Sequence, residues 1–337
     1  MAKHHQVSDY DISLVMEQFA VDADRWQHIT SGDTNTSYIL SKEKEPLYIL
    51  SFLGRRAMDP SKLWNALAHV EANGIKAPVP RLTPSGETHL AYKGHLVVIK
   101  PFIRGECNRI LPPNRMAEAG VLLGQIHSLA PLPELREWGH KRLLLDRWSA
   151  RIGSACLALL HKREELQGLL PKRLIGIIDL TSREYSEWLR ESIKITNHID
   201  KMELPQGFIH GDFWSDNIVC AEDGQLVAID WDNAGWGSFI YDIAFALNGL
   251  LQNDTGILDK KRLNDFLEGY ESIRPLAEKE KKILPDALLR AAAFISVGRL
   301  YRHHILNPEP ACHDPQKYGK YEETVYIGQA AKSLRFM

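Results

Sequence analysis

Residues 208–232 constrain the fold of this chain more than any other segment. Glu222-Asp223-Gly224 is a turn signal between two short apolar runs, so the pattern predicts a β-hairpin. Folding the chain back about the Asp223–Gly224 pair places Asn217 opposite Asp230 at the open end of the hairpin. The loop that carries Asp212 immediately precedes the hairpin. The segment therefore predicts that three oxygen-bearing side chains converge.

A small set of oxygen ligands suits Mg²⁺, which keeps several waters and takes further ligands from phosphates. The layout is typical of phosphotransfer enzymes. In these, one carboxylate accepts the proton of a substrate hydroxyl, while an Asn and a second Asp hold the metal ions that bridge the nucleotide phosphates. The alternative is a polar loop before an ordinary hairpin. The agreement of residue types, hairpin and spacing favours the phosphotransfer interpretation.

His210-Gly211-Asp212, followed by Asn217, resembles the catalytic loop of the aminoglycoside and choline kinase superfamily. The segment Ile229–Asp232 resembles the metal-binding segment of the same superfamily. The resemblance implies that Asp212 is the catalytic base and that Asn217 and Asp230 are Mg²⁺ ligands. It also implies that His210 is a structural support and that ATP is the co-substrate.

Composition gives this chain an ordinary globular character. It has 337 residues, of which 44% are hydrophobic and 25% charged, enough for one large or two modest domains. With a net charge of −2 it has no global basic field, so we expect neither a nucleic-acid nor a membrane partner. The four cysteines form no C-x-x-C pair, and no signal peptide or membrane-spanning run is visible. We therefore expect a cytoplasmic protein, and the oligomeric state is left open.

The pattern along the chain changes near residue 103. Before it, strands are expected around 38–50 and 95–99, with helices at 8–20 and 61–73. Beyond it the pattern is mainly helical, at 115–129, 146–166, 181–200, 241–251, 259–271, 277–305 and 319–334. This order resembles the bilobal protein-kinase-like α+β fold. The resemblance implies a small β-rich N-lobe (1–103) with a hinge at about 99–103, and a larger, mostly helical C-lobe (104–337).

Two segments of the expected N-lobe are candidates for nucleotide binding. Residues 30–37 form a small polar stretch whose backbone N–H groups could face a phosphate, although a plain surface turn has the same composition. Its place before two strands resembles the nucleotide-covering loop of the superfamily, and its candidate residues are Gly32, Asp33, Thr34 and Asn35. Residues 99–103 occupy the place of the hinge, where Lys100 and Phe102 are the candidates.

One position departs from the usual kinase pattern. Most kinases of this type carry a lysine in the strand after the nucleotide loop, paired with a helix glutamate. Here Ser51 stands at the lysine position, and no acid occurs in residues 62–70. Arg55 and Arg56, just past the strand, are the candidate replacements. The departure resembles the homoserine kinase type within the superfamily, as do the segments 34–38, 231–235 and 241–248.

Three further polar features have less specific patterns. His127 ends a predicted helix, where a packing or capping role is expected rather than a chemical one. Asp242 opens another predicted helix, and we expect it to brace the catalytic loop, with N-capping as the alternative. One late helical stretch carries basic residues that could hold an anionic substrate group, although a solvated face is the default. These residues are Arg290, Arg299, Arg302, His303 and His304.

The sequence thus predicts an ATP- and Mg²⁺-dependent kinase acting on a hydroxyl of a small metabolite, with homoserine as the best single substrate. One alternative is a kinase for aminoglycoside antibiotics or for choline-type amino alcohols. Aminoglycosides are polycations and would require an acidic cleft. An alternative of another class is a nucleotide-binding pseudokinase with a structural or regulatory role. The missing lysine favours the pseudokinase, whereas the intact Asp212, Asn217 and Asp230 oppose it.

Overall fold

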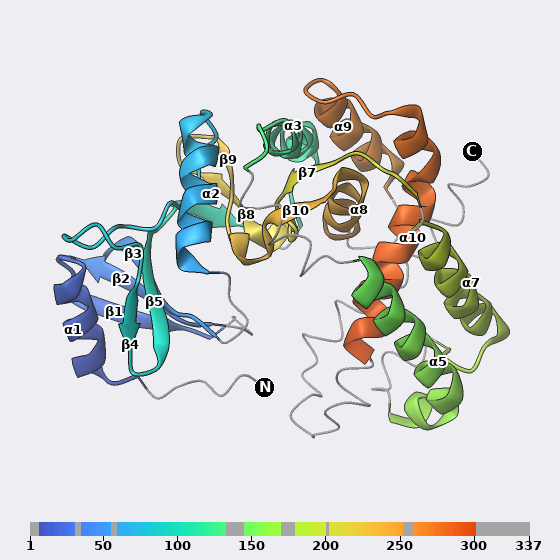
Figure 1. Cartoon of the computed structure of the whole chain (residues 1–337), viewed down its shortest axis with the longest axis horizontal. Helices are drawn as coiled ribbons and strands as arrows, with labels where there is room; N and C mark the ends of the chain where they lie inside the picture. Colours follow the sequence, from blue (N-terminus) through green and yellow to red (C-terminus); the bar gives the residue numbers. More distant parts are fainter. Residues whose placement is uncertain are drawn as a thin grey trace. The chain divides into compact units, whose positions relative to one another are not determined.

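The computed structural model describes residues 7–30, 35–54, 59–108, 110–132, 145–169, 179–199, 202–251 and 259–300. They form a mixed α+β structure, which confirms the predicted fold class (Figure 1). The chain divides into two compact units. The first comprises Met1–Asn108, Pro131–Leu135 and Asp216–Ala234, and the second comprises Arg109–Ala130, Arg136–Ser215 and Gly235–Met337. The first unit takes residues from both sides of residue 103, and the division into lobes at that residue stays a prediction.

The first unit is built on a five-stranded antiparallel sheet in the order β1-β2-β3-β5-β4. Its strands are β1 (Arg25–Ile29), β2 (Thr36–Lys42), β3 (Glu45–Phe52), β4 (Leu90–Tyr92) and β5 (His95–Pro101). Helix α1 (Asp9–Gln18) begins with a capping box between Ser8 and Asp11. A second helix, α2 (Pro60–Ala72), follows β3 in the chain.

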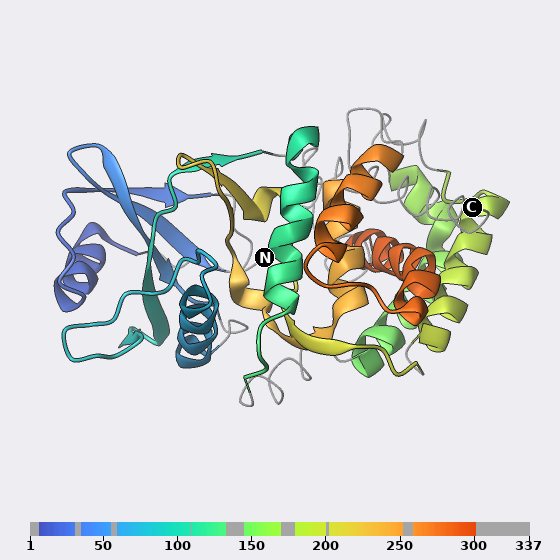
Figure 2. The same cartoon turned by 90° about the horizontal axis from the view of Figure 1, so that it is seen from above.

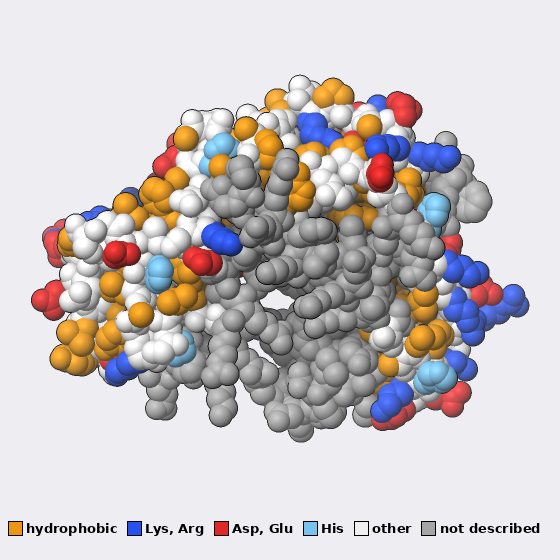
Figure 3. Space-filling view, in the orientation of Figure 1, with side chains coloured by type: hydrophobic (Ala, Val, Ile, Leu, Met, Phe, Trp, Pro, Cys, Tyr) orange, Lys and Arg blue, Asp and Glu red, His pale blue; other side chains and the backbone are white. Residues whose placement is uncertain are grey.

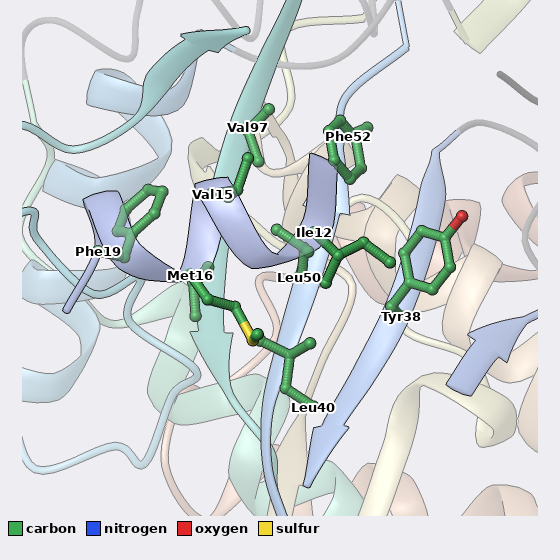
Figure 4. Packing of buried hydrophobic residues seen from close by; sticks show 10 residues of the cluster. Ile12, Val15, Met16, Phe19, Tyr38, Leu40, Leu50, Phe52 and Val97 are labelled. Carbon is green, nitrogen blue, oxygen red and sulfur yellow. The ribbon is translucent and has the colours of Figure 1, made fainter. Parts of the chain in front are cut away.

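Helix α1 covers one face of this sheet (Figure 4). Its apolar residues recur at helical spacing, and they meet strand residues that alternate along β2, β3 and β5. The resulting core contains Ile12, Val15, Met16, Phe19, Tyr38, Leu40, Leu50, Phe52, Val97 and Ile99. Because side chains alternate along a strand, the opposite face carries Ser51 and its register partners Ser37 and Val98, together with Lys100.

The predicted hairpin is present in the first unit as β8 (Ile218–Ala221) and β9 (Leu226–Ala228), but its register differs by one residue from the prediction. Ile218 pairs with Ala228, so the N–H of Ile229 donates to the carbonyl of Asn217 at 2.9 Å, and Asp230 is not the residue opposite Asn217. The N–H of Ala221 donates to the carbonyl of Gln225 at 2.9 Å, so the loop that this pair closes contains three residues and ends with Gly224 at φ +85°. Such loops close with a glycine in the left-handed conformation, whereas the prediction assumed a two-residue turn.

The hairpin is attached to the rest of the first unit by one strand pairing and by two contacts of its turn. Strand β6 (Gly105–Cys107) pairs with β8 and completes a three-stranded sheet in the order β6-β8-β9. Lys76 forms an ion pair with Asp223 at the hairpin turn, with 2.7 Å between Nζ and Oδ2. The N–H of Glu222 donates to the carbonyl of Arg104 at 3.1 Å.

The second unit is mostly helical. Its main helices are α3 (Met116–His127), α5 (Leu145–Leu169), α7 (Arg183–Ile199), α8 (Phe239–Leu250), α9 (Lys260–Glu271) and α10 (Glu278–Leu300), with a short 3-10 turn η1 (Pro113–Arg115). Strands β7 (Gln206–Ile209) and β10 (Gly235–Ser238) form a two-stranded antiparallel sheet. These helices confirm the helical predictions between residues 115 and 300. The helix expected at 319–334 lies outside the described residues.

Helices α3 and α9 lie side by side in the second unit, as Figures 1 and 2 show. Their backbones approach closely because glycines face the partner helix. A Cβ atom on Gly120 would come within 2.0 Å of the Phe266 carbonyl oxygen, and one on Gly269 within 2.0 Å of the Ala117 carbonyl oxygen. Any larger residue would therefore force the helices apart. The close packing brings the C-terminal end of α3 against α9.

The described surface carries charges of both signs. On the face shown in Figure 3, acidic and basic side chains are interspersed with uncharged ones. Among the described helices, none combines the length and apolar character needed to cross a membrane.

Candidate active site

The loop that carries Asp212 lies in the second unit and follows the buried strand β7. Gly211 has φ +78°, a left-handed conformation that glycine adopts without steric cost and that turns the chain sharply after His210. The carboxylate of Asp242 accepts the N–H of His210 and the N–H of Gly211, both at 2.9 Å. Asp242 is only 2% exposed and lies within α8. The prediction that Asp242 braces this loop is therefore confirmed.

Buried aromatic residues fix the loop on both sides of Asp212. The ring of His210 is fully buried, and its Nδ1 accepts the backbone N–H of Asp212 at 3.2 Å. Phe213 is also fully buried and contacts His210 edge-to-face. The Trp214 ring occupies the space above Gly249, where a Cβ atom would come within 2.5 Å of it. Asp212 itself is partly exposed, and its backbone is held by these buried neighbours.

A second buried contact reaches Asp242 from α3. His127 is 3% exposed, and its Nε2 lies 3.1 Å from Oδ2 of Asp242. Burial lowers the pKa of His127 below its usual value. Burial opposes ionisation of Asp242, but hydrogen bonds from His127 and from the His210 backbone bring the pKa of Asp242 below its usual value. At neutral pH we therefore assign a neutral imidazole and an ionised carboxylate. The expected packing role of His127 agrees with its burial.

Asp230 lies in the first unit, directly after the hairpin, next to other acidic groups. Asp230 is an exposed residue, but the protein atoms around its carboxylate displace water and raise the pKa of Asp230. Asp232 and Asp216 raise this pKa further by repulsion, whereas the positive charge of Lys100 lowers it. A divalent cation bound at Asp230 would relieve this repulsion, as the sequence interpretation requires.

The backbone at this point is unusual. Asp230 has φ 58° and ψ 61°, in the left-handed region that is uncommon for residues other than glycine. The 3-10 turn η3 (Trp231–Asn233) follows, and the buried Trp231 donates its Nε1–H to the carbonyl of Ala228 at 2.8 Å. This hydrogen bond holds the turn η3 against strand β9 of the hairpin.

Asn35 connects the sheet to the same segment within the first unit. Its Nδ2 donates to Oδ2 of Asp232 at 2.7 Å, and its Oδ1 accepts the N–H of Gly54 at 2.9 Å. The sequence interpretation placed Asn35 in the nucleotide loop. The structure shows that both ends of its side chain make protein contacts, which position Asp232. Asp232 itself is buried and was not selected from the sequence, although it lies only two residues after Asp230.

Within the described residues, no group of three or more His, Cys, Asp or Glu side chains is arranged to hold a metal ion. This does not conflict with the expected site. Mg²⁺ is commonly bound through one or two carboxylates together with waters and substrate phosphates. The 3-10 turn η2 (Ser215–Asn217) contains the point where the chain passes from the second unit to the first. In the sequence, Asp212 precedes this boundary and Asn217 follows it.

The remaining nucleotide candidates have different outcomes. Ser51 is 2% exposed and its hydroxyl lies 2.9 Å from that of Ser37. Lys100 and Phe102 are partly exposed, and the N–H of Phe102 donates to the carbonyl of Leu47 at 2.9 Å. Gly32, Asp33, Thr34, Arg55 and Arg56 lie outside the described residues. The nucleotide-binding role of all these candidates stays a prediction.

The late basic stretch is partly within α10. Arg290 is only 6% exposed and its guanidinium lies 4.5 Å from the centre of the Tyr241 ring, so a solvated face is wrong for this residue. Arg302, His303 and His304 lie outside the described residues, and nothing is assigned to the side chain of Arg299.

Comparison with known proteins identifies the family. The model of the phosphotransferase enzyme family matches residues 25–276. A homoserine kinase from Polaromonas naphthalenivorans (strain CJ2) is 29% identical over 296 residues, which cover 84% of each chain. A spectinomycin phosphotransferase in complex with ADP and spectinomycin has a TM-score of 0.66 at 14% identity, covering 97% of this chain and 99% of that one. An amicoumacin kinase in complex with AMP-PNP, Ca²⁺ and Ami has a TM-score of 0.63 at 14% identity, covering 97% and 94%. The chain belongs to the phosphotransferase enzyme family and is a small-molecule kinase.

Proposed function

We propose that this kinase transfers the γ-phosphoryl group of ATP, with Mg²⁺, to the side-chain hydroxyl of homoserine. The observation that carries the choice of substrate is the similarity to a homoserine kinase over 84% of both chains. The Ser51 position, which lacks the usual lysine, points to the same type of enzyme. ADP in the spectinomycin phosphotransferase and AMP-PNP in the amicoumacin kinase support ATP as co-substrate, and the Ca²⁺ of the amicoumacin kinase supports a divalent metal ion.

In this proposal Asp212 orients the acceptor hydroxyl and accepts its proton. Its backbone is held by Asp242 and by the buried neighbours of the loop, so the carboxylate needs little reorganisation when the reaction occurs. Asn217 and Asp230 would hold Mg²⁺, which supplies positive charge to the phosphates. The repulsion among the acidic groups near Asp230 supports a cation at this place.

Lys100 is a candidate for the positive charge that Ser51 does not supply. It lies on the same face of the sheet as Ser51, one strand away, and its charge lowers the pKa of Asp230. We infer that its ammonium group contacts the nucleotide phosphates. Lys100→Ala should then raise the KM for ATP, whereas Ser51→Ala should have a small effect. If only the double Arg55→Ala, Arg56→Ala variant raises this KM, the charge comes from the arginines instead.

The test of the substrate is ATP turnover, measured as ADP release, with homoserine, choline, ethanolamine, methylthioribose and a set of aminoglycosides. We expect kcat/KM to be highest for homoserine. A preference of tenfold or more for another acceptor would reject homoserine and leave the kinase assignment intact. Because the fold is similar to that of a spectinomycin phosphotransferase, spectinomycin should be included among the tested acceptors. Absence of turnover with every acceptor, alongside normal binding of Mg·ATP, would instead favour the pseudokinase alternative.

A further inference from the structure

A chain of buried polar side chains extends from Asp242, past the C-terminal end of α9, to Glu280 in α10. His127 Nε2 contacts Asp242 at 3.1 Å, and His127 Nδ1 lies 2.8 Å from the hydroxyl of Tyr270. Arg274 donates from Nη1 to that hydroxyl at 3.0 Å, and from Nη2 to both carboxylate oxygens of Glu280 at 3.1 Å. The side chain of Arg274 is 14% exposed, and Tyr270 and Glu280 are fully buried. We call these five residues the buried polar chain.

Arg274 can only donate and ionised Asp242 can only accept, so these two residues fix the direction of the hydrogen bonds between them in the buried polar chain. Arginine is a donor only, so the Tyr270 oxygen accepts from Arg274 and its own O–H donates to His127 Nδ1. Nδ1 must then carry a lone pair, which places the imidazole proton on Nε2. That proton is donated to Asp242, an acceptor when ionised. The neutral state that burial favours for His127 therefore satisfies all the contacts at once.

The fold brings Tyr270 to His127 by the close approach of α3 and α9. Gly124, one turn before His127, faces the carbonyl of Tyr270, where a Cβ atom would come within 3.0 Å. Phe239 completes the surroundings. The Arg274 guanidinium lies 4.1 Å from the centre of its ring, and its ring centre is 4.8 Å from that of His127. The side chains are thus held by packing as well as by hydrogen bonds.

We propose that Tyr270 and Arg274 are positioning residues for the catalytic loop. By holding His127 in the Nε2–H tautomer, they keep Asp242 ionised and oriented toward the N–H groups of His210 and Gly211. The backbone at Asp212 is thereby positioned through side chains that lie at and just beyond the C-terminal end of α9. The inference rests on the proposed role of Asp212 for its effect on catalysis, but its effect on His127 and on the loop is independent of that role.

Tyr270→Phe tests the proposal because it removes one hydroxyl and keeps the ring. We expect kcat to fall about tenfold or more, because losing a hydrogen bond that orients a functional side chain typically costs that much. The KM for ATP should stay within about twofold of the wild-type value. Arg274→Lys should also lower kcat. Tyr185→Phe is the matched control, since its buried hydroxyl has no hydrogen-bond partner among the described residues and α7 contributes no residue to the buried polar chain. It should leave kcat unchanged.

Two measurements without substrate separate positioning from general stability. In protein labelled with ¹⁵N-histidine, the His127 signal, assigned by its loss in His127→Asn, should show the Nε2–H tautomer in the wild type. It should shift toward a mixture of tautomers in Tyr270→Phe. The Gly211 amide, observed with ¹⁵N-glycine, should exchange with solvent faster in Tyr270→Phe but not in Tyr185→Phe.

An unchanged His127 tautomer together with unchanged Gly211 exchange in Tyr270→Phe would overturn the proposal, whatever the kinetics. A kcat within twofold of the wild type in a folded Tyr270→Phe variant would also overturn it. If the wild type phosphorylates none of the tested acceptors, the proposed function fails, and the two NMR measurements alone decide on the positioning role.

Discussion

At the scale of single residues, Asp212 combines an accessible carboxylate with a fixed backbone. Asp212→Asn keeps the shape and hydrogen bonding of the side chain and removes the proton acceptor. We expect kcat to fall roughly 10²-fold or more while the affinity for nucleotide changes little. Asp223→Asn, at the exposed hairpin turn, is the control for loss of one carboxylate. Near-normal turnover of Asp212→Asn would remove Asp212 from the role of base.

His127 should make the stability of the protein depend on pH. Burial lowers the pKa of His127 in the folded state, while the unfolded chain has the ordinary value near 6.5. Below that value the unfolded state binds a proton that the folded state does not, so the free energy of unfolding falls as the pH falls. The slope should reach at most about 1.4 kcal/mol per pH unit from this one residue.

The measurement is urea unfolding between pH 7.5 and 5.5 for the wild type and for His127→Asn. The variant is expected to be less stable overall but to lose less stability on acidification than the wild type. His198→Asn, at an exposed position of α7, should retain the wild-type slope. Parallel pH profiles for wild type and His127→Asn would contradict the buried, neutral state assigned to His127.

At the scale of secondary-structure elements, the contact between α3 and α9 depends on glycine. Gly269→Ala would place a methyl group 2.0 Å from the Ala117 carbonyl oxygen, so the helices must separate. We expect a loss of about 1–3 kcal/mol in the free energy of unfolding. Gly168→Ala in α5 is the matched control, because no atom of the described residues lies within 4 Å of its Cβ position. It should stabilise the protein by up to about 1 kcal/mol. Equal effects of the two changes in urea unfolding would contradict the close contact.

Local elements could be predicted from the sequence because their signals are local. Helical periodicity gave α1, α3 and α9, and turn residues gave the hairpin. The hairpin register was wrong by one residue because the loop has three residues and not two. Small errors of this kind come from turns whose length depends on backbone angles that the sequence does not specify uniquely.

Contacts between distant parts of the chain could not be predicted in this way. Asn35 and Asp232 are 197 residues apart, and His127 and Tyr270 are 143 apart. No periodicity or spacing relates such positions, since their meeting depends on how whole elements pack. The candidates Asp212, Asn217 and Asp230 could be proposed because they lie close together in sequence. The supporting residues His210 and Asp242 were also expected, whereas Asp232, Tyr270 and Arg274 were not.

At the scale of the whole molecule, binding of Mg·ATP should be visible as stabilisation. A ligand at about 100 times its Kd raises the free energy of unfolding by about 2.7 kcal/mol. We expect a rise in Tm with ATP and Mg²⁺ together, and a much smaller rise with ATP and EDTA. Asp230→Ala should abolish the difference between these two conditions, because Asn217 alone offers no charge to the metal ion. An unchanged Mg²⁺-dependent rise in Asp230→Ala would reject Asp230 as a ligand.

The left-handed backbone of Asp230 limits which residues can occupy this position. A left-handed conformation costs most residues about 1–2 kcal/mol, and Asn and Asp tolerate it because their short side chains hydrogen-bond locally. Glutamate has the same charge and the same ligand atoms, but a longer side chain without that local bonding. The proposed metal-ligand role at this position therefore depends on chain conformation as well as on charge. The substitution that seems most conservative by chemistry, Asp230→Glu, is disfavoured by the geometry of the peptide backbone.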